Sequence, residues 1–216
     1  MRSGGEFVRF ITSSGRLLDG DTALHAMVDL WCRTDYTRLP VAVPLVASIA
    51  VETIAAATGH DVVRPGRSMR SMAELALRHK IGFAGSTTGG YLFADFLASY
   101  DAVMTLGSVA RMLGTVGQSL DDVVDALPEF HKRHASIFCP IDRKGAVMRV
   151  VTQASDGLQV ELAEGVRIVF DDAWVLVLPH ASDPLVNVWV EADTGEAAET
   201  LLTQWQGVVE GAIEID

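Results

Sequence analysis

The segment "LPVAVPLVASIAVETIAAATGHDVVRPGRSMRSMAELALRHKIGFAG", residues 39–85, decides the fold because short apolar runs alternate in it with helical patterns. The expected elements are strands at 41–46, 61–65 and 81–85 and helices at 48–59 and 69–80. Alternation of strands with helices predicts an α/β domain, in which helices cover both faces of a doubly wound, mostly parallel sheet.

Two more helices are expected to complete this domain, over residues 102–113 and 120–127. Ser119 stands directly before the second of them, and Asp121 and Asp122 lie in its first turn. This is the arrangement of an N-terminal cap, because side-chain oxygens accept hydrogen bonds from the free N–H groups of a helix start. The sequence therefore predicts one α/β domain over residues 39–136.

A different pattern occupies the rest of the chain. Residues 131–140, HKRHASIFCP, are interpreted as a linker. Beyond it the sequence predicts a helix at 143–154, strands at 158–162, 166–170, 174–178 and 186–191, and a closing helix at 195–213. The order helix, strand meander, helix predicts a smaller α+β domain over residues 137–216, with its helices on one face of an antiparallel four-stranded sheet.

The N-terminal residues predict too little structure for a domain of their own. Residues 6–18 are expected to form a hairpin around SSG, and residues 22–33 a helix that begins after "DGD", residues 19–21. A hairpin and one helix cannot bury a core of useful size.

Composition narrows the classes of function. Of the 216 residues, 49% are hydrophobic and the formal net charge is −11, so nucleic acid and anionic membranes are not expected as partners. The two cysteines, Cys32 and Cys139, are isolated, which favours a reducing compartment over a disulfide framework or a structural zinc site. No apolar run has the length of a membrane span and no secretion signal is recognised, so a cytoplasmic protein is expected.

Four segments carry a family resemblance: VVRPGRSMRSMAELA (62–76), FAGSTTGGYLFADF (83–96), SLDDVVDALPEFH (119–131) and FDDAWVLVLPHASDPLVNVWVEA (170–192). Their order resembles the C-terminal half of the α-D-phosphohexomutases, which include phosphomannomutase and phosphoglucomutase. The resemblance implies that residues 1–38 are the end of the family's second domain, and that 39–136 and 137–216 are its third and fourth domains. It also implies a multidomain enzyme that moves phosphate between C1 and C6 of a hexose through a phosphoserine. That serine's domain is not in this sequence, so no catalytic residue is expected in it.

The family's magnesium loop, Asp-Gly-Asp-x-Asp-Arg, is degenerate in this chain. Counting back through the predicted hairpin places its three carboxylate positions on Arg2, Gly4 and Glu6. Magnesium needs oxygen ligands, and only one carboxylate is left, so no metal or other cofactor is expected in this chain. Asp19 and Asp21 are favoured as helix-capping residues over the alternative that they bind the metal.

Two more family loops have changed. Ser86 stands where the sugar-recognition loop has glutamate, and with Thr88 it offers only hydroxyl groups to a sugar. The alternative, that this loop is only a glycine-rich connection from a strand to the next strand or helix, is kept open on equal terms with sugar recognition. Arg64, Arg67 and Arg70 lie where the family contributes a basic residue near the reacting phosphate, and the alternative for them is a solvated surface.

The family's phosphate loop, Arg-Pro-Ser-Gly-Thr-Glu-Pro with a later arginine, has lost both arginines. Leu178 and Asn187 replace them, while Ser182 and Asp183 hold the threonine and glutamate places. His180 offers at most a partial charge near pH 7. Two missing charged hydrogen bonds weaken phosphate capture by a factor on the order of a hundred or more, so a structural turn is favoured.

Two functions follow from these observations. The first is a mutase-like module without catalysis, a structural or regulatory part of a longer sugar-nucleotide biosynthesis protein such as a mannose-1-phosphate guanylyltransferase fusion. The second is the distal half of an active phosphomannomutase or phosphoglucomutase. The expected partners are a sugar phosphate, upstream domains of the same protein, or a second copy. The residues with the best chance of binding substrate are Arg64, Arg67, Ser86, Thr88, His180, Ser182 and Asp183.

Overall fold

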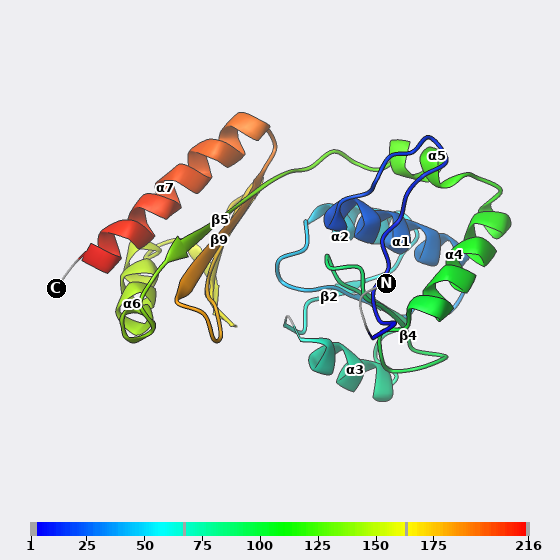
Figure 1. Cartoon of the computed structure of the whole chain (residues 1–216). Coiled ribbons are helices and arrows are strands. Elements are labelled where there is room, and N and C mark those ends of the chain that lie inside the picture. The colour runs from blue at the N-terminus through cyan, green and yellow to red at the C-terminus, as the bar shows by residue number, and fades with distance from the viewer. Residues whose placement is uncertain (1–3, 67, 163, 215–216) are drawn as a thin grey trace. The chain divides into compact units, whose positions relative to one another are not determined.

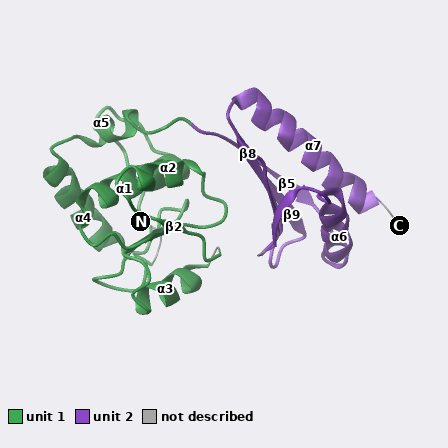
Figure 2. Cartoon of the chain, turned by 180° about the vertical axis from the view of Figure 1, so that it is seen from behind, with its two compact units in different colours: residues 1–129 green, residues 130–216 purple. Residues whose placement is uncertain are grey.

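The structure, a computed structural model, describes residues 4–66, 68–162 and 164–214. The chain divides into two compact units, residues 1–129 and residues 130–216, which Figure 2 shows in different colours.

The first unit has a mixed four-stranded sheet in the order β2-β1-β3-β4. Its strands are β1 (Val41–Ala42), β2 (Val62–Val63), β3 (Phe83–Gly85) and β4 (Tyr91–Phe93). β1 pairs in parallel with β2 and β3, whereas β4 pairs antiparallel with β3. The predicted α/β class with a mostly parallel sheet is confirmed.

Helices cover both faces of this sheet (Figure 1). They are α1 (Gly20–Thr34), α2 (Ala50–Ala56), α3 (Met69–Leu77), α4 (Ala102–Val116) and α5 (Leu120–Asp125). Alternate strand residues divide between two cores: Val41 and Phe83 share one with α1, α2, α4 and α5, whereas Ala42 and Ala84 share the other with α3. This division is what a parallel sheet buried on both faces requires.

The N-terminal hairpin belongs to the first unit and is fastened to α5. Oδ2 of Asp121 accepts hydrogen bonds from the main-chain N–H of Ser13 (3.0 Å) and the Ser13 hydroxyl (2.5 Å), and Oδ1 accepts one from the Ser14 hydroxyl (2.6 Å). These bonds, those from Ser13 first, lower the pKa of Asp121. Ser119 and Asp122 form the capping box of α5, so the two aspartates predicted as capping residues have separate tasks.

The second unit has five antiparallel strands rather than the predicted four, in the order β5-β9-β8-β7-β6. Its elements are β5 (His131–Phe138), a 3₁₀ turn (Ile141–Arg143), α6 (Lys144–Ala154), β6 (Gln159–Leu162), β7 (Val166–Val169), β8 (Ala173–Pro179), β9 (Leu185–Ala192) and α7 (Gly195–Glu214). The predicted α+β class with an antiparallel sheet is confirmed.

The interpretation of residues 131–140 as a linker is wrong, because most of them form the edge strand β5. This strand pairs with β9 from His131↔Ala192 to Phe138↔Leu185. Its basic residues conceal the strand pattern, since an edge strand tolerates exposed charge and only Ile137 of β5 is fully buried. The expected domain boundary at Ser136 therefore falls inside a strand, and the two compact units divide at residues 129 and 130.

One face of this second sheet packs on its two helices. Val175, Val177, Val186 and Val188 point into that core, and Trp205 of α7 lies in it. Among the described residues, no helix is long and apolar enough to cross a membrane.

Candidate functional site

The Arg64 side chain, just after β2, is used entirely within the first unit. Its Nε and Nη2 each donate to one carboxylate oxygen of Glu52, both at 2.9 Å. Nη1 donates to the carbonyls of Pro44 (3.0 Å) and Ala47 (2.9 Å), and Nη2 also donates to that of Ser48 (3.0 Å). A guanidinium has five N–H donors, so none is left for a phosphate. Arg64 therefore has a structural role, and we do not propose it as a substrate-binding residue.

The other two arginines of this segment add no binding site. The Arg70 side chain is 88% exposed and pairs with Glu74 one turn later on α3 (3.1 Å), as a solvated surface residue does. Arg67 lies outside the described residues.

The loop over residues 86–90 joins β3 to β4. The Ser86 hydroxyl lies 2.8 Å from that of Thr88, and its oxygen accepts hydrogen bonds from the N–H groups of Thr88 (3.3 Å) and Gly90 (3.2 Å). The two hydroxyls that were predicted to bind a sugar therefore lie within hydrogen-bonding distance of each other.

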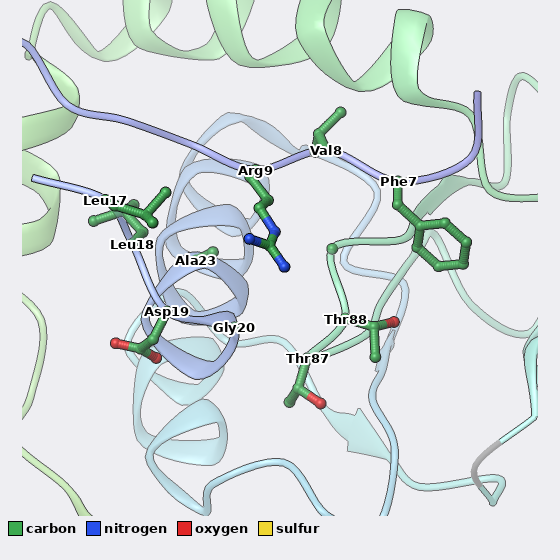
Figure 3. A pocket seen from close by; sticks show the side chains of 11 residues that line it. Phe7, Val8, Arg9, Leu17, Leu18, Asp19, Gly20, Ala23, Thr87 and Thr88 are labelled. Atoms are coloured by element: carbon green, nitrogen blue, oxygen red, sulfur yellow. The ribbon is translucent and has the colours of Figure 1, made fainter. Parts of the chain in front are cut away.

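A pocket of about 700 Å³ opens beside this loop, within the first unit (Figure 3). The N-terminal hairpin, the start of α1 and the loop over residues 86–90 surround it. The Arg9 guanidinium points into the space between α1 and Thr87, whereas the Asp19 carboxylate is turned away from Arg9. Sequence analysis did not single out Arg9, because an isolated arginine on a short hairpin gives no signal. The lining residues are Phe7, Val8, Arg9, Leu17, Leu18, Asp19, Gly20, Ala23, Thr87, Thr88 and Gly89.

Asp19 is the N-cap of α1, as predicted. Its two oxygens accept hydrogen bonds from the Thr22 N–H (2.9 Å) and the Thr22 hydroxyl (2.7 Å). Burial raises the pKa of Asp19, but the hydrogen bonds from Thr22 outweigh it, so the pKa is lowered and the carboxylate is charged at neutral pH.

The degenerate magnesium loop does not fit a metal. Gly4 offers no side-chain ligand and Glu6 is a single exposed carboxylate, while Arg2 lies outside the described residues. Magnesium sites in proteins use carboxylate and other oxygen ligands together, and one carboxylate is too few. Within the described ranges, no group of three histidine, cysteine or acidic side chains is placed to hold a metal ion.

The loop between β8 and β9 is a hairpin turn, and the two residues that the resemblance matched to the family's arginines, Leu178 and Asn187, are buried. Leu178 is 2% exposed and Asn187 is 6% exposed. The Asn187 side-chain oxygen accepts a hydrogen bond from Ser136 (2.7 Å) and lies 3.2 Å from Nε2 of His134. The Asp183 N–H donates to Nδ1 of His180 (3.0 Å). Of the three predicted binding residues on this turn, His180 and Asp183 are thus engaged with each other, and the Ser182 hydroxyl donates to Asp183 (3.3 Å).

Lys144, the first residue of α6, is a cation at this turn that the sequence analysis missed. Its ammonium donates to the main-chain carbonyls of His180 (2.5 Å) and Asp183 (2.6 Å). The contacts join residues 36 and 39 positions apart, so no local pattern could reveal them. Charged hydrogen bonds of this length are strong, and they hold the turn from the side of α6.

Replacing Lys144 with methionine is expected to loosen this turn while the rest of the unit stays folded. Each hydrogen bond from a charged donor contributes about 1.5–3 kcal/mol, less at a partly exposed site, so local opening becomes easier by about 1–2 kcal/mol. Amide hydrogen exchange of Asp183 and Leu185 should accelerate about tenfold. Arg149→Met, an exposed cation on the same helix, is the control and should leave both amides unchanged. Equal exchange in the two variants would show that Lys144 does not hold the turn.

The two thiols are not available as nucleophiles. Both cysteines are free and buried. Burial raises the pKa of Cys32 to about 12 and also raises the pKa of Cys139. A thiol reacts as its thiolate, which neither cysteine forms to a useful extent at neutral pH.

Comparison with known proteins identifies relatives of this chain. The model of the phosphoglucomutase/phosphomannomutase α/β/α domain III matches residues 19–130. A phosphoglucomutase/phosphomannomutase of Thermococcus kodakarensis is 27% identical over 206 residues, which are 95% of this chain and 45% of that protein. A probable phosphoglucosamine mutase of Methanopyrus kandleri is 26% identical over 209 residues, 96% of this chain and 46% of that protein. The chain thus spans less than half the length of these relatives.

Solved structures agree on the fold. A phosphoglucomutase/phosphomannomutase family protein of Burkholderia thailandensis matches with a TM-score of 0.77 and 16% identity, over 96% of this chain and 45% of that one. The phosphoglucomutase parafusin of Paramecium matches with a TM-score of 0.73 and 13% identity, over 95% and 43%. Because the domain model covers more than half of the 216 residues, the chain belongs to the phosphoglucomutase/phosphomannomutase family and corresponds to its C-terminal half.

Proposed function

We propose that this chain is a phosphohexomutase-like module without catalysis of its own, a structural or regulatory part of a longer cytoplasmic protein of sugar-nucleotide biosynthesis. A mannose-1-phosphate guanylyltransferase that carries a mutase-like tail is one such protein. The partners in this proposal are upstream domains of the same protein, a sugar phosphate or a second copy, and not nucleic acid or a membrane.

The observation that carries the proposal is the state of the phosphate loop. Leu178 is buried in the second unit, and the Asn187 amide oxygen is already engaged by Ser136 and His134. Neither position presents a cation to a ligand. The Lys144 ammonium donates two of its three N–H groups to main-chain carbonyls of the turn. A loop built in this way keeps its shape, and it captures a phosphate poorly.

Changes at the other loops support the same proposal. Arg64 has no free donor, the hydroxyls of Ser86 and Thr88 bond to each other, and the magnesium positions retain one carboxylate. Phosphoryl transfer relies on positioned cations around the phosphate, because charge develops on its oxygens in the transition state. The phosphate loop has lost cations, and the sugar and magnesium loops have lost carboxylates. These changes together are compatible with a fold that is kept for reasons other than catalysis.

The second candidate, the distal half of an active mutase, is favoured by the relatives. Those described above are named as mutases, and they match nearly all of this chain. Those relatives are about twice as long as this chain. Mutase activity is therefore proposed for this chain only as the alternative.

The deciding experiment is to isolate the native polypeptide that carries this sequence, determine its intact mass, and assay it for two activities. One assay follows interconversion of hexose 1- and 6-phosphates with magnesium, and the other follows nucleotidyl transfer to a hexose 1-phosphate. We expect no mutase turnover. Mutase turnover that Asn187→Ala or a deletion of residues 130–216 abolishes would overturn the proposal in favour of the active half-enzyme.

A further inference from the structure

One face of α4 exposes apolar and small side chains. Another side of this helix packs on α1, and Figure 1 shows α4 at the edge of the first unit. On the outer side, Val103 is 71% exposed and Leu106 is 50% exposed. Phe96 and Leu97, in the segment that leads into α4, are exposed as well. Apolar patches of roughly 300–600 Å² on a monomer are often functional, so this concentration of exposed apolar residues indicates a contact surface.

The small residues of this face form a row along the helix. With about 3.6 residues per turn, Val103, Gly107, Ala110 and Gly114 lie within roughly 60° of one another around the helix axis. Glycine inside a helix is destabilising relative to alanine, so two glycines on one exposed face need a reason. A Cβ on Gly107 or on Gly114 would meet none of the described residues within 4 Å. The packing of the first unit therefore gives no steric reason for glycine at these two places.

The exposed glycines of α7 have different surroundings. Gly207 and Gly211 are equally open, but Glu210 and Glu214 lie on the same side of that helix. Water solvates such a charged face well. In α4, by contrast, Arg111 is the one charged residue, so covering the outer face removes few charges from water.

Two copies of this face are complementary in antiparallel orientation. Val103 of one copy then faces Gly114 of the other, and Gly107 faces Ala110. Both pairs are symmetric about one point near the middle of α4, which a two-fold axis between identical chains requires. Each valine fills the space above a glycine, and the small residues between them let the two backbones approach closely. Antiparallel helices also bring opposite ends of their dipoles together.

We propose that this outer face of α4 binds a second copy of the chain, in an antiparallel pair of helices related by a two-fold axis. Charge favours this place for self-association, because two chains of net charge −11 repel each other and α4 has no acidic residue. One helix pair covers less than the roughly 800 Å² per partner that stable interfaces bury, so the dimer is weak and reversible. The inference rests on the proposed function only in choosing a second copy among the partners named there.

Sedimentation equilibrium of the 216-residue chain from about 1 to 200 µM measures this association. We expect a monomer–dimer equilibrium that added salt shifts toward the dimer, because salt screens the repulsion between the acidic chains. Val103→Lys and Gly114→Glu should each weaken the dimer about tenfold or more, since each buries a charge without a partner. The double variant should recover the dimer, because the lysine of one copy then faces the glutamate of the other. Positions 103 and 114 lie about 16 Å apart along one helix, so recovery requires the antiparallel contact.

The matched control combines Val103→Lys with Gly211→Glu, which adds the same carboxylate on α7, and it should not recover the dimer. Gly107→Ala separates association from stability. Its methyl group stabilises α4 in the monomer but holds the two helices apart, so dilute samples should be more stable while the dimer weakens. A chain that stays monomeric at about 200 µM, or a dimer that these variants leave unchanged, would overturn the inference. If the chain is monomeric and Val103→Lys destabilises the native polypeptide that carries it, the face belongs to another part of that polypeptide, which also overturns the inference.

The dimer and the proposed function fail separately. A monomeric chain removes the second copy from the proposed partners and leaves mutase turnover to its own assay. Turnover by the native polypeptide would overturn the proposed function, whereas the association of the α4 variants would be unchanged.

Discussion

Replacing Arg64 with alanine is expected to lower the free energy of unfolding of the first unit by about 3 kcal/mol. The Arg64 side chain is 11% exposed, and its guanidinium connects Glu52 of α2 with the carbonyls of Pro44, Ala47 and Ser48. Removing it leaves three main-chain carbonyls without their charged donor, and a buried acceptor without a partner costs about 1–3 kcal/mol. Glu52 is 46% exposed, so water can solvate it again and its loss contributes less.

Urea denaturation measures this prediction, with amide hydrogen exchange to assign the loss to the first unit. The amides of β1 and α2 should lose protection, whereas those of β8 and β9 should not, because the second unit has its own core. Arg64→Lys should recover little, since an ammonium has three donors and cannot reproduce the fork that meets both Glu52 oxygens. Arg70→Ala is the control, and its exposed pair with Glu74 should be worth no more than about 0.5 kcal/mol. A loss of stability in Arg64→Ala no larger than in the control would remove its structural role.

Arg64 also shows the limit of what could be predicted from the sequence. Its place after a strand, close to two more arginines, made Arg64 a candidate phosphate-binding residue beside the alternative of a solvated surface, because sequence spacing shows which charges are near each other along the chain. Sequence spacing does not show that the main-chain carbonyls of residues 44–48 lie against the Arg64 guanidinium. β4 was not expected as a strand, whereas β1, β2 and β3 were predicted, since apolar runs bounded by Pro and Gly depend on local pattern alone. Their ends were not: β1 stops at Ala42, and the following residues, including Pro44, turn toward Arg64.

The second unit shows the same limit. Four of its strands follow from alternating apolar residues, while β5 carries HKRH and was interpreted as a linker. What makes it a strand is pairing with β9, where His134 stacks on Trp189 with ring centroids 4.6 Å apart. Long-range pairing of this kind overrides local propensity. The contacts of Lys144 were missed for the same reason, because they depend on segments far apart in the chain.

The last prediction concerns Gly20, the first residue of α1. Glycine at this place looks like part of a capping sequence, and the structure adds a steric reason for it. A Cβ on Gly20 would lie 1.8 Å from the Thr87 carbonyl oxygen and 2.9 Å from its carbon, both main-chain atoms. Neither can rotate away, so α1 or the loop over residues 86–90 must move.

Gly20→Ala is therefore expected to destabilise the first unit by about 2–3 kcal/mol, as overpacking against a fixed backbone does. Gly107→Ala is the matched control: Gly107 lies inside α4, and a Cβ there would meet nothing within 4 Å. Alanine is the better helix former by about 1 kcal/mol, so this variant should be more stable than the parent. The same chemical change should thus shift the urea midpoint in opposite directions at the two sites. Parent-like stability in Gly20→Ala would mean that the start of α1 and this loop are not packed as closely as the structure shows.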